Sequence, residues 1–126
     1  MTLRVLVVDD NEDHRFLTRR AVAALGPQVE VALAEDGPAA LRAAAEVRPD
    51  IVLLDVKMPG MDGFEVLRRL RGDAATRDVV VVMFTSSDSE ADRERGEALG
   101  ASGFVTKPLD AKAFARVVRE TLEAYL

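Results

Sequence analysis

Short apolar runs alternate with longer segments of helical periodicity five times along the chain. The apolar runs, rich in Val, Ile, Leu and Phe, are Leu3–Val8, Gln28–Ala34, Asp50–Leu54, Val79–Phe84 and Gly103–Thr106. The segments between them are about 10–15 residues long, and helical spacing is clearest in the last, at Phe114, Val117, Val118, Thr121, Leu122 and Tyr125. Strand–helix alternation predicts a parallel sheet with right-handed crossovers and helices on both faces.

The composition of the five runs predicts their order in the sheet. Leu3–Val8, Ile51–Leu54 and Val79–Phe84 are almost wholly apolar, as in strands buried on both faces. Gln28–Ala34 alternates between apolar and polar residues, and Gly103–Thr106 is short and contains glycine, so both suit sheet edges. The doubly wound order 2-1-3-4-5 of flavodoxin-like α/β folds meets this constraint. It places a functional site at the carboxyl ends of the strands, beside the switch point between the first and third.

Length and composition exclude several classes of protein. The 126 residues suit one domain, expected to span residues 1–126, and 48% of them are apolar, enough for a hydrophobic core. Cysteine is absent, which removes disulfides and thiol chemistry, and the net charge of 17 − 22 = −5 argues against direct nucleic-acid binding. No apolar run approaches the roughly 18–20 residues of a membrane span, and no signal peptide is evident, so we expect a cytoplasmic protein without membrane contact.

The helix expected from about Ser89 to Leu99 is the weakest of the five. Its segment from Asp92 to Glu97 offers few apolar anchors, and Gly96 costs it about 1 kcal/mol relative to alanine. A marginal helix of this kind is easily moved.

Polar side chains stand where four of the strands end. Asp9-Asp10-Asn11 follow the first strand, Asp55 the third, Thr85-Ser86-Ser87 the fourth and Lys107-Pro108 the fifth. Any of the first group could cap the next helix, as could Ser86, Ser87 or Ser89. Asp55 is harder to explain as a cap, because the turn from Lys57 to Gly63 delays the helix that follows it.

A metal site explains these residues together. Three carboxylates at one sheet edge repel each other unless a cation joins them, and magnesium suits a small site of oxygen ligands. Neutralised in this way, the Asp55 carboxylate could approach a phosphoryl group as a nucleophile. The Thr85 hydroxyl and the Lys107 ammonium could then hold phosphoryl oxygens. Only three of the 17 basic residues are lysines (Lys57, Lys107 and Lys112), which draws attention to Lys107.

These motifs carry a resemblance to a known family. The paired acids Asp9 and Asp10, the run Asp-x-x-Met-Pro-Gly-Met-Asp-Gly from Asp55 to Gly63, Thr85, and the Lys107-Pro108 pair occur in this order. The chain, from roughly Leu3 to Leu122, thereby resembles the receiver domain of two-component response regulators. The resemblance implies a signalling protein, of the stand-alone, single-domain type, rather than an enzyme acting on an external substrate. A phosphorelay intermediate and the receiver of a longer protein are the alternatives.

The resemblance also implies roles for individual residues. Asp55 would accept a phosphoryl group from a sensor histidine kinase and would later lose it by autodephosphorylation. Asp10 would bind Mg²⁺ (or Mn²⁺) directly together with Asp55 and the backbone carbonyl of Lys57, and Asp9 would act through water. Thr85 and Lys107 would bind the phosphoryl oxygens, and the side chains of Lys57 and Ser87 would tune dephosphorylation.

Phosphorylation in this family changes a surface. Thr85 would move toward the phosphoryl group and Phe104 would fill the space it leaves, altering the surface made by the helix at 89–99, the strand Gly103–Thr106 and the final helix. Many members have tyrosine where this chain has Phe104, and alanine or glycine where it has Ser86. The alternative interpretation of Phe104 is a core aromatic on an edge strand. His14 is expected to be an exposed or half-exposed side chain of the first helix.

Partners follow from the same resemblance. A homodimer could form through the surface just described, and the stretches 87–90 and 98–101 resemble regulators that work beside phytochrome-type kinases. The downstream target is unknown.

Two competing hypotheses are an aspartyl phosphohydrolase and a flavin- or nucleotide-binding module. The first would need a second Asp where Lys57 stands, and the second would need a glycine-rich loop after the first strand.

Overall fold

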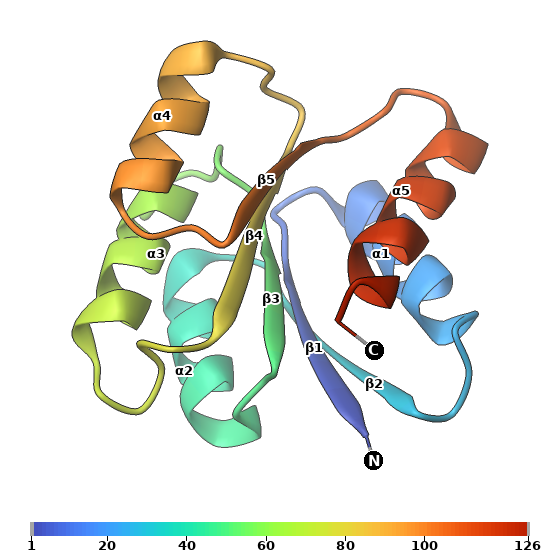
Figure 1. Ribbon diagram of the computed structural model, residues 1–126, viewed down its shortest axis with the longest axis horizontal. Helices are drawn as coiled ribbons and strands as arrows, with labels where there is room; N and C mark the ends of the chain where they lie inside the picture. The colour runs from blue at the N-terminus through green and yellow to red at the C-terminus, as the bar shows by residue number, and fades with distance from the viewer. Residues whose placement is uncertain (1, 126) are drawn as a thin grey trace.

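Five parallel strands form one sheet in the computed structural model, which describes residues 2–125 (Figure 1). They are β1 (Leu3–Val8), β2 (Val29–Ala34), β3 (Ile51–Leu54), β4 (Val80–Thr85) and β5 (Gly103–Thr106). Their order is β2-β1-β3-β4-β5, as predicted, and every adjacent pair is parallel. The two ends of the predicted domain, residues 1 and 126, lie outside the described range.

Five helices cover the two faces of this sheet. They are α1 (Glu12–Ala23), α2 (Gly37–Val47), α3 (Gly63–Gly72), α4 (Glu90–Ala98) and α5 (Ala111–Glu123). Helices α1 and α5 lie on one face, and α2, α3 and α4 lie on the other (Figure 1). The fold is the flavodoxin-like α/β arrangement that the alternating pattern predicts. Among residues 2–125 there is no helix with the length and apolar character needed to cross a bilayer.

The core lies in two halves, because successive residues of a strand point to opposite faces. On the side of α1 and α5, Val5 and Val7 of β1 pack with Ile51 and Leu53 of β3. On the other side the alternate residues of both strands pack beneath α2 and α3, among them Leu6 and Leu54. These two central strands are therefore buried on both faces, as their continuous apolar runs predict.

The edge strands are less buried, also as predicted. All four residues of β5 are partly exposed, and in β2 only Val29 and Ala34 are buried. Leu33, which belongs to the apolar side of β2, is 41% exposed. An edge strand pairs on one side only, so the ends of its apolar row can reach the margin of the sheet.

Helix N-caps resolve the alternatives left open for the strand-end residues. Asn11 caps α1 by accepting from the His14 N–H, and Ser89 caps α4 by accepting from the Asp92 N–H. Asp62 caps α3 in the same way, seven residues after Asp55. The acids Asp9, Asp10 and Asp55 are therefore not needed as N-caps for these helices.

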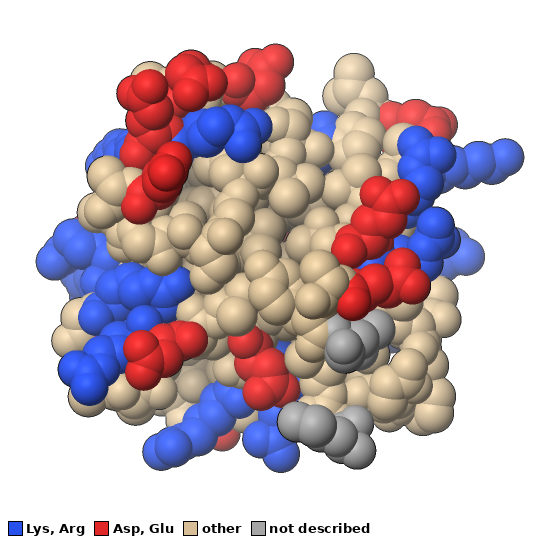
Figure 2. Space-filling model, in the orientation of Figure 1, with Lys and Arg blue, Asp and Glu red and all other residues tan. Residues whose placement is uncertain are grey.

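Helix α4 is the least anchored helix, as expected. Gly96 is its single buried residue, and its other side chains are charged or small. Arg93 and Arg95 place their guanidinium groups over the rings of Phe104 and Phe64. Acidic side chains gather at the upper left of the space-filling view, where Figure 1 places α4 (Figure 2). The helix is thus held mainly by contacts at the surface.

Candidate functional site

Three carboxylates meet at the carboxyl edge of the sheet. Asp9 and Asp10 follow β1 and Asp55 follows β3, and these strands are neighbours with Val8 opposite Leu54. One carboxylate oxygen from each acid lies within 4.8 Å of the other two. Asp9 and Asp55 are buried, whereas Asp10 is exposed. The strand order thus brings together residues that are 45 positions apart in the sequence.

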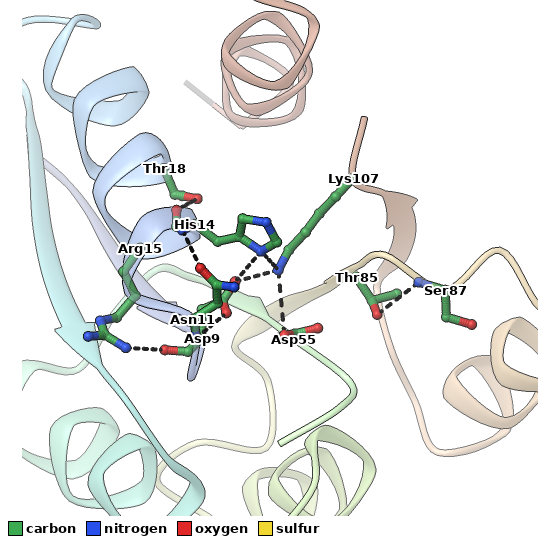
Figure 3. A network of polar contacts seen from close by, with 9 residues as sticks. All are labelled: Asp9, Asn11, His14, Arg15, Thr18, Asp55, Thr85, Ser87 and Lys107. Atoms are coloured by element: carbon green, nitrogen blue, oxygen red, sulfur yellow. Dashed lines mark hydrogen bonds and ion pairs between the residues drawn. The ribbon is translucent and has the colours of Figure 1, made fainter. Parts of the chain in front are cut away.

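Lys107 reaches the same point from the end of β5 (Figure 3). Its side chain is buried, and its ammonium group donates a hydrogen bond to Asp9 Oδ2 and lies 3.5 Å from Asp55 Oδ2. The backbone N–H of Lys107 donates to the Thr85 carbonyl oxygen at 2.7 Å, which fixes the start of the side chain beside β4. Lys57 and Lys112 are exposed. Lys107 is therefore the one lysine that is buried among carboxylates.

The Asp55 carboxyl lies in an environment that disfavours its charge. Burial raises its pKa above the ordinary value for aspartate, and the nearby Asp9 carboxylate raises it further. The Lys107 ammonium and a hydrogen bond with the Thr85 side chain act in the opposite direction. The pKa of Asp55 remains raised overall, so the Lys107 ammonium does not offset the burial of this carboxyl.

Thr85 and Ser87 occupy the loop after β4. Thr85 is buried, and its hydroxyl oxygen accepts from the Ser87 N–H at 3.2 Å. The Ser87 hydroxyl donates to Asp92 Oδ2 of α4 at 2.8 Å. Figure 3 shows Thr85 beside Asp55, with the Ser87 side chain on the far side of Thr85. Ser87 therefore links the loop to α4 in this state.

Phe104 and Lys57 do not join the carboxylate cluster through their side chains. Phe104 is half-buried on β5, packs against the core half covered by α2 and α3, and lies under Arg93. Its packing agrees with a core aromatic on an edge strand, and its contact with α4 also suits a switch position. The Lys57 side chain is exposed, two residues beyond Asp55.

The cluster fits a hard divalent cation. All of its donors are oxygens, and one carboxylate oxygen from each of the three acids lies within 4.8 Å of the other two. The pKa of Asp55 is raised mainly by burial and further by the nearby Asp9 carboxylate, so its charged form lacks a sufficient partner. A cation there would lower that pKa and keep the carboxylate ionised. Asp9, Asp10 and Asp55 are the residues whose side chains could hold it.

Two residues of α1 make contacts at this site that the sequence did not predict. His14 is half-exposed, as expected, but its Nδ1 lies 3.0 Å from Lys107 Nζ. Arg15 donates from Nη1 to the Asp9 carbonyl oxygen at 2.8 Å. Helical spacing could have indicated His14, since it lies four and seven residues before Thr18 and Ala21, which are buried. No comparable signal marks Arg15.

The chain matches the model of a known protein family. The family model of the response regulator receiver domain matches residues 5–119. The chain belongs to this family, whose members are signalling proteins phosphorylated by histidine kinases, typically on aspartate.

Individual relatives agree with this assignment. The chain is 50% identical over 118 residues to the response regulator PleD of Caulobacter vibrioides, matching 93% of this chain but only 26% of PleD. It is 34% identical to the protein PilH of Pseudomonas aeruginosa, over 94% of this chain and 97% of PilH. Among solved structures, the chemotaxis protein CheY4 of Vibrio cholerae superposes with a TM-score of 0.86 at 31% identity, over the full length of both chains.

Proposed function

We propose that this receiver domain accepts a phosphoryl group on Asp55 in a Mg²⁺-dependent reaction and transmits the change to the surface formed by α4, β5 and α5. The observation that carries the proposal is the convergence of the buried Asp55 carboxylate, two further acids and the buried Lys107 ammonium at one sheet edge. Asp55 differs from the other two acids in following a buried central strand with no helix directly after it.

In the proposed phosphoryl transfer one bond forms and one bond breaks. An Asp55 carboxylate oxygen attacks the phosphorus of a phosphohistidine on the kinase, an O–P bond forms, and the P–N bond breaks. The electron pair of that bond returns to the histidine nitrogen of the kinase. Lys107, 3.5 Å from Asp55 Oδ2, is close enough to donate to a phosphoryl oxygen on Asp55. Thr85, which already interacts with the Asp55 side chain, would donate a hydrogen bond from its hydroxyl group to a second phosphoryl oxygen.

We propose Mg²⁺, with Mn²⁺ as an alternative, as the cation of this site. Asp10 and Asp55 would bind it directly with the Lys57 carbonyl oxygen, and Asp9 through water. The cation would supply charge neutralisation between the acidic residues and the incoming phosphoryl group. Asp9 already has Lys107 as a partner, which supports an indirect role for its carboxylate.

The output proposal rests on the weak attachment of α4. The ring of Phe104 lies under the guanidinium of Arg93, and Ser87 ties the loop after Thr85 to Asp92. Movement of Thr85 toward a phosphoryl group would disturb Ser87, whose N–H donates to the Thr85 hydroxyl oxygen and whose own hydroxyl donates to Asp92 of α4. The space that Thr85 leaves would be open to Phe104, whose ring contacts α4 through Arg93. We propose that a partner protein, or a second copy of the chain, reads this surface, and that Lys57 and Ser87 set the lifetime of the phosphoryl group. A phytochrome-type kinase as the source of the signal stays a prediction.

The direct test is labelling by acetyl phosphate with Mg²⁺, followed by intact-mass measurement. Wild-type protein should gain one phosphoryl group and Asp55→Asn should gain none. Asp78→Asn is the matched control, since Asp78 is exposed and lies before β4, at the opposite edge of the sheet. If Asp55→Asn is labelled as strongly as the control, Asp55 is not the acceptor.

A further inference from the structure

His14 contacts the buried lysine of the site (Figure 3). Its Nδ1 lies 3.0 Å from Lys107 Nζ and 4.0 Å from Asp9 Oδ2. The ring also contacts Phe114 of α5, with 5.7 Å between the ring centroids. His14 is the single histidine of the chain.

The chemistry of the two groups fixes the direction of this hydrogen bond. An ammonium group carries three donors and no acceptor, so Nδ1 of His14 must accept. The ring proton of the neutral imidazole then belongs on Nε2. Because the acceptor is neutral, it holds the ammonium without adding a fourth negative charge to the three carboxylates.

The backbone of His14 is held on both sides. Its N–H donates to the N-cap side chain of Asn11 at 3.0 Å, and its carbonyl oxygen accepts from the Thr18 hydroxyl at 2.8 Å. The imidazole therefore projects from a fixed point in the first turn of α1. Lysine, in contrast, has a long flexible stem whose end group needs partners to stay in one place.

We propose that His14 is a positioning residue for Lys107, an inference that rests on the proposed function. Asp9, Asp55 and His14 supply three acceptors around Lys107 Nζ, from the ends of β1 and β3 and from α1. They match the three donors of the ammonium group. His14 thereby keeps Lys107 directed at the Asp55 oxygen that would carry the phosphoryl group.

The hydrogen bond itself can be tested by ¹⁵N NMR of the imidazole, which reports one residue in this chain. At pH above about 8, where imidazoles are ordinarily neutral, we expect the Nε2–H tautomer with a hydrogen-bonded Nδ1. In Lys107→Met the Nδ1 resonance should shift downfield toward that of a free acceptor. An Nδ1–H tautomer in the wild type would overturn the proposal, as would an Nδ1 shift unchanged in a folded Lys107→Met. The wild-type tautomer decides the question if Lys107→Met does not fold.

The positioning role can be tested with two variants of opposite design. In His14→Asn the side-chain oxygen is as far from Cβ as Nδ1 is, so the acceptor is kept and the ring is lost. In His14→Leu apolar bulk against Phe114 is kept and the acceptor is lost. With acetyl phosphate and saturating Mg²⁺, the phosphorylation rate should fall about tenfold in His14→Leu, the scale of one hydrogen bond to a charged group. His14→Asn should stay within about threefold of the wild type, as expected for a retained bond.

Packing alone would give the opposite order. Equal rates in the two variants, or a slower His14→Asn, would therefore overturn the positioning role. Thermal unfolding of each variant separates loss of fold from loss of rate. A wild type that takes no label would refute the proposed function and the positioning role with it, while the NMR result would still decide whether the hydrogen bond exists.

Discussion

The guanidinium group of Arg93 lies over the ring of Phe104, with Arg93 Cζ 4.9 Å from the ring centroid. Arg93 Nη1 also donates to the Phe104 carbonyl oxygen at 3.4 Å. Both contacts join α4 to the edge strand β5, and both are exposed. Since Gly96 is the single buried residue of α4, these surface contacts account for much of its attachment.

Removing the Arg93 side chain should loosen α4 selectively. In Arg93→Ala we expect faster amide hydrogen exchange within α4, because an exposed cation–π contact contributes about 0.5–1 kcal/mol. Exchange in β1 and β3 should change little. The control is Arg42→Ala, at an exposed position of α2. Equal α4 exchange in the two variants would contradict this account of α4.

Gly63 is required where α3 begins behind Asp55. A Cβ atom there would lie 2.1 Å from the Asp55 carbonyl oxygen and 2.9 Å from Val56 Cα, and both are backbone atoms that cannot move alone. Gly63→Ala should therefore lower the free energy of unfolding by about 1–3 kcal/mol or more, as overpacking does. It should also slow phosphorylation, since the clash shifts Asp55.

Gly72 provides the matched control for this prediction. It ends the same helix, and a Cβ atom there would meet nothing within 4 Å. Gly72→Ala should stabilise the protein by about 0.4–1 kcal/mol, because alanine reduces the freedom of the unfolded chain. Urea unfolding of both variants measures the difference. A Gly63→Ala as stable as Gly72→Ala would show that the backbone at Asp55 can yield.

Magnesium should stabilise the folded protein through the acidic cluster. A ligand that binds only the folded state, at a concentration a hundredfold above its Kd, contributes about 2.7 kcal/mol. The melting temperature should therefore rise on adding Mg²⁺ and fall again with EDTA. In Asp10→Asn, at an exposed member of the cluster, the rise should shrink markedly. An undiminished rise in Asp10→Asn would remove Asp10 from the binding residues.

Without metal, the Asp55 carboxylate should weaken the fold near neutral pH. Its pKa is raised in the folded state above the ordinary value of 3.8, so the folded protein holds this proton more tightly than the unfolded chain. Below pH 3.8 Asp55 is protonated in both the folded and the unfolded state, so its ionisation does not affect stability there. It becomes increasingly destabilising as the pH rises through the interval up to the raised pKa.

Asp55→Asn isolates this effect, because asparagine does not ionise. In EDTA the variant should be more stable than the wild type at pH 7, and the difference should disappear below the ordinary aspartate pKa of 3.8. Urea unfolding across this pH range checks the sign. A stability difference that is independent of pH would mean that ionisation of Asp55 does not cause it.

The sheet and its functional edge were predictable because their signals are local. Continuous apolar runs mark the central strands β1 and β3, and the polar residues directly after them lie at the carboxyl edge in any parallel sheet. The predicted bounds of β1 and β5 agree with the structure, those of β2 and β3 begin one residue too early, and those of β4 are shifted by one residue at both ends. Strand order alone places Asp9, Asp10 and Asp55 side by side, because β1 and β3 are neighbours. Lys107 follows β5, two strands from β3, and reaches the acids through its buried side chain.

Contacts that depend on side-chain direction were not predictable in the same way. Several residues before α1 and α4 have side chains that could act as an N-cap, and only the backbone path shows that Asn11 and Ser89 are the N-caps. The contact of His14 with Lys107 joins residues 93 positions apart, on a helix and at a strand end. Helical periodicity indicates the inward face of α1 but not the atom that His14 would meet.

The sequence by itself determined the fold class, the strand order and which acids share one edge, because hydrophobic periodicity and strand polarity act over a few residues at a time. The tertiary structure decided which groups are buried and which hydrogen bonds they form. Burial raises the pKa of Asp55, and the packing of β1, β5 and α1 brings the Lys107 ammonium to Asp9 and His14. Helix α4, which buries little, is attached through Arg93 and Arg95. These properties depend on distance and solvent exclusion between segments far apart in the chain, which no local pattern records.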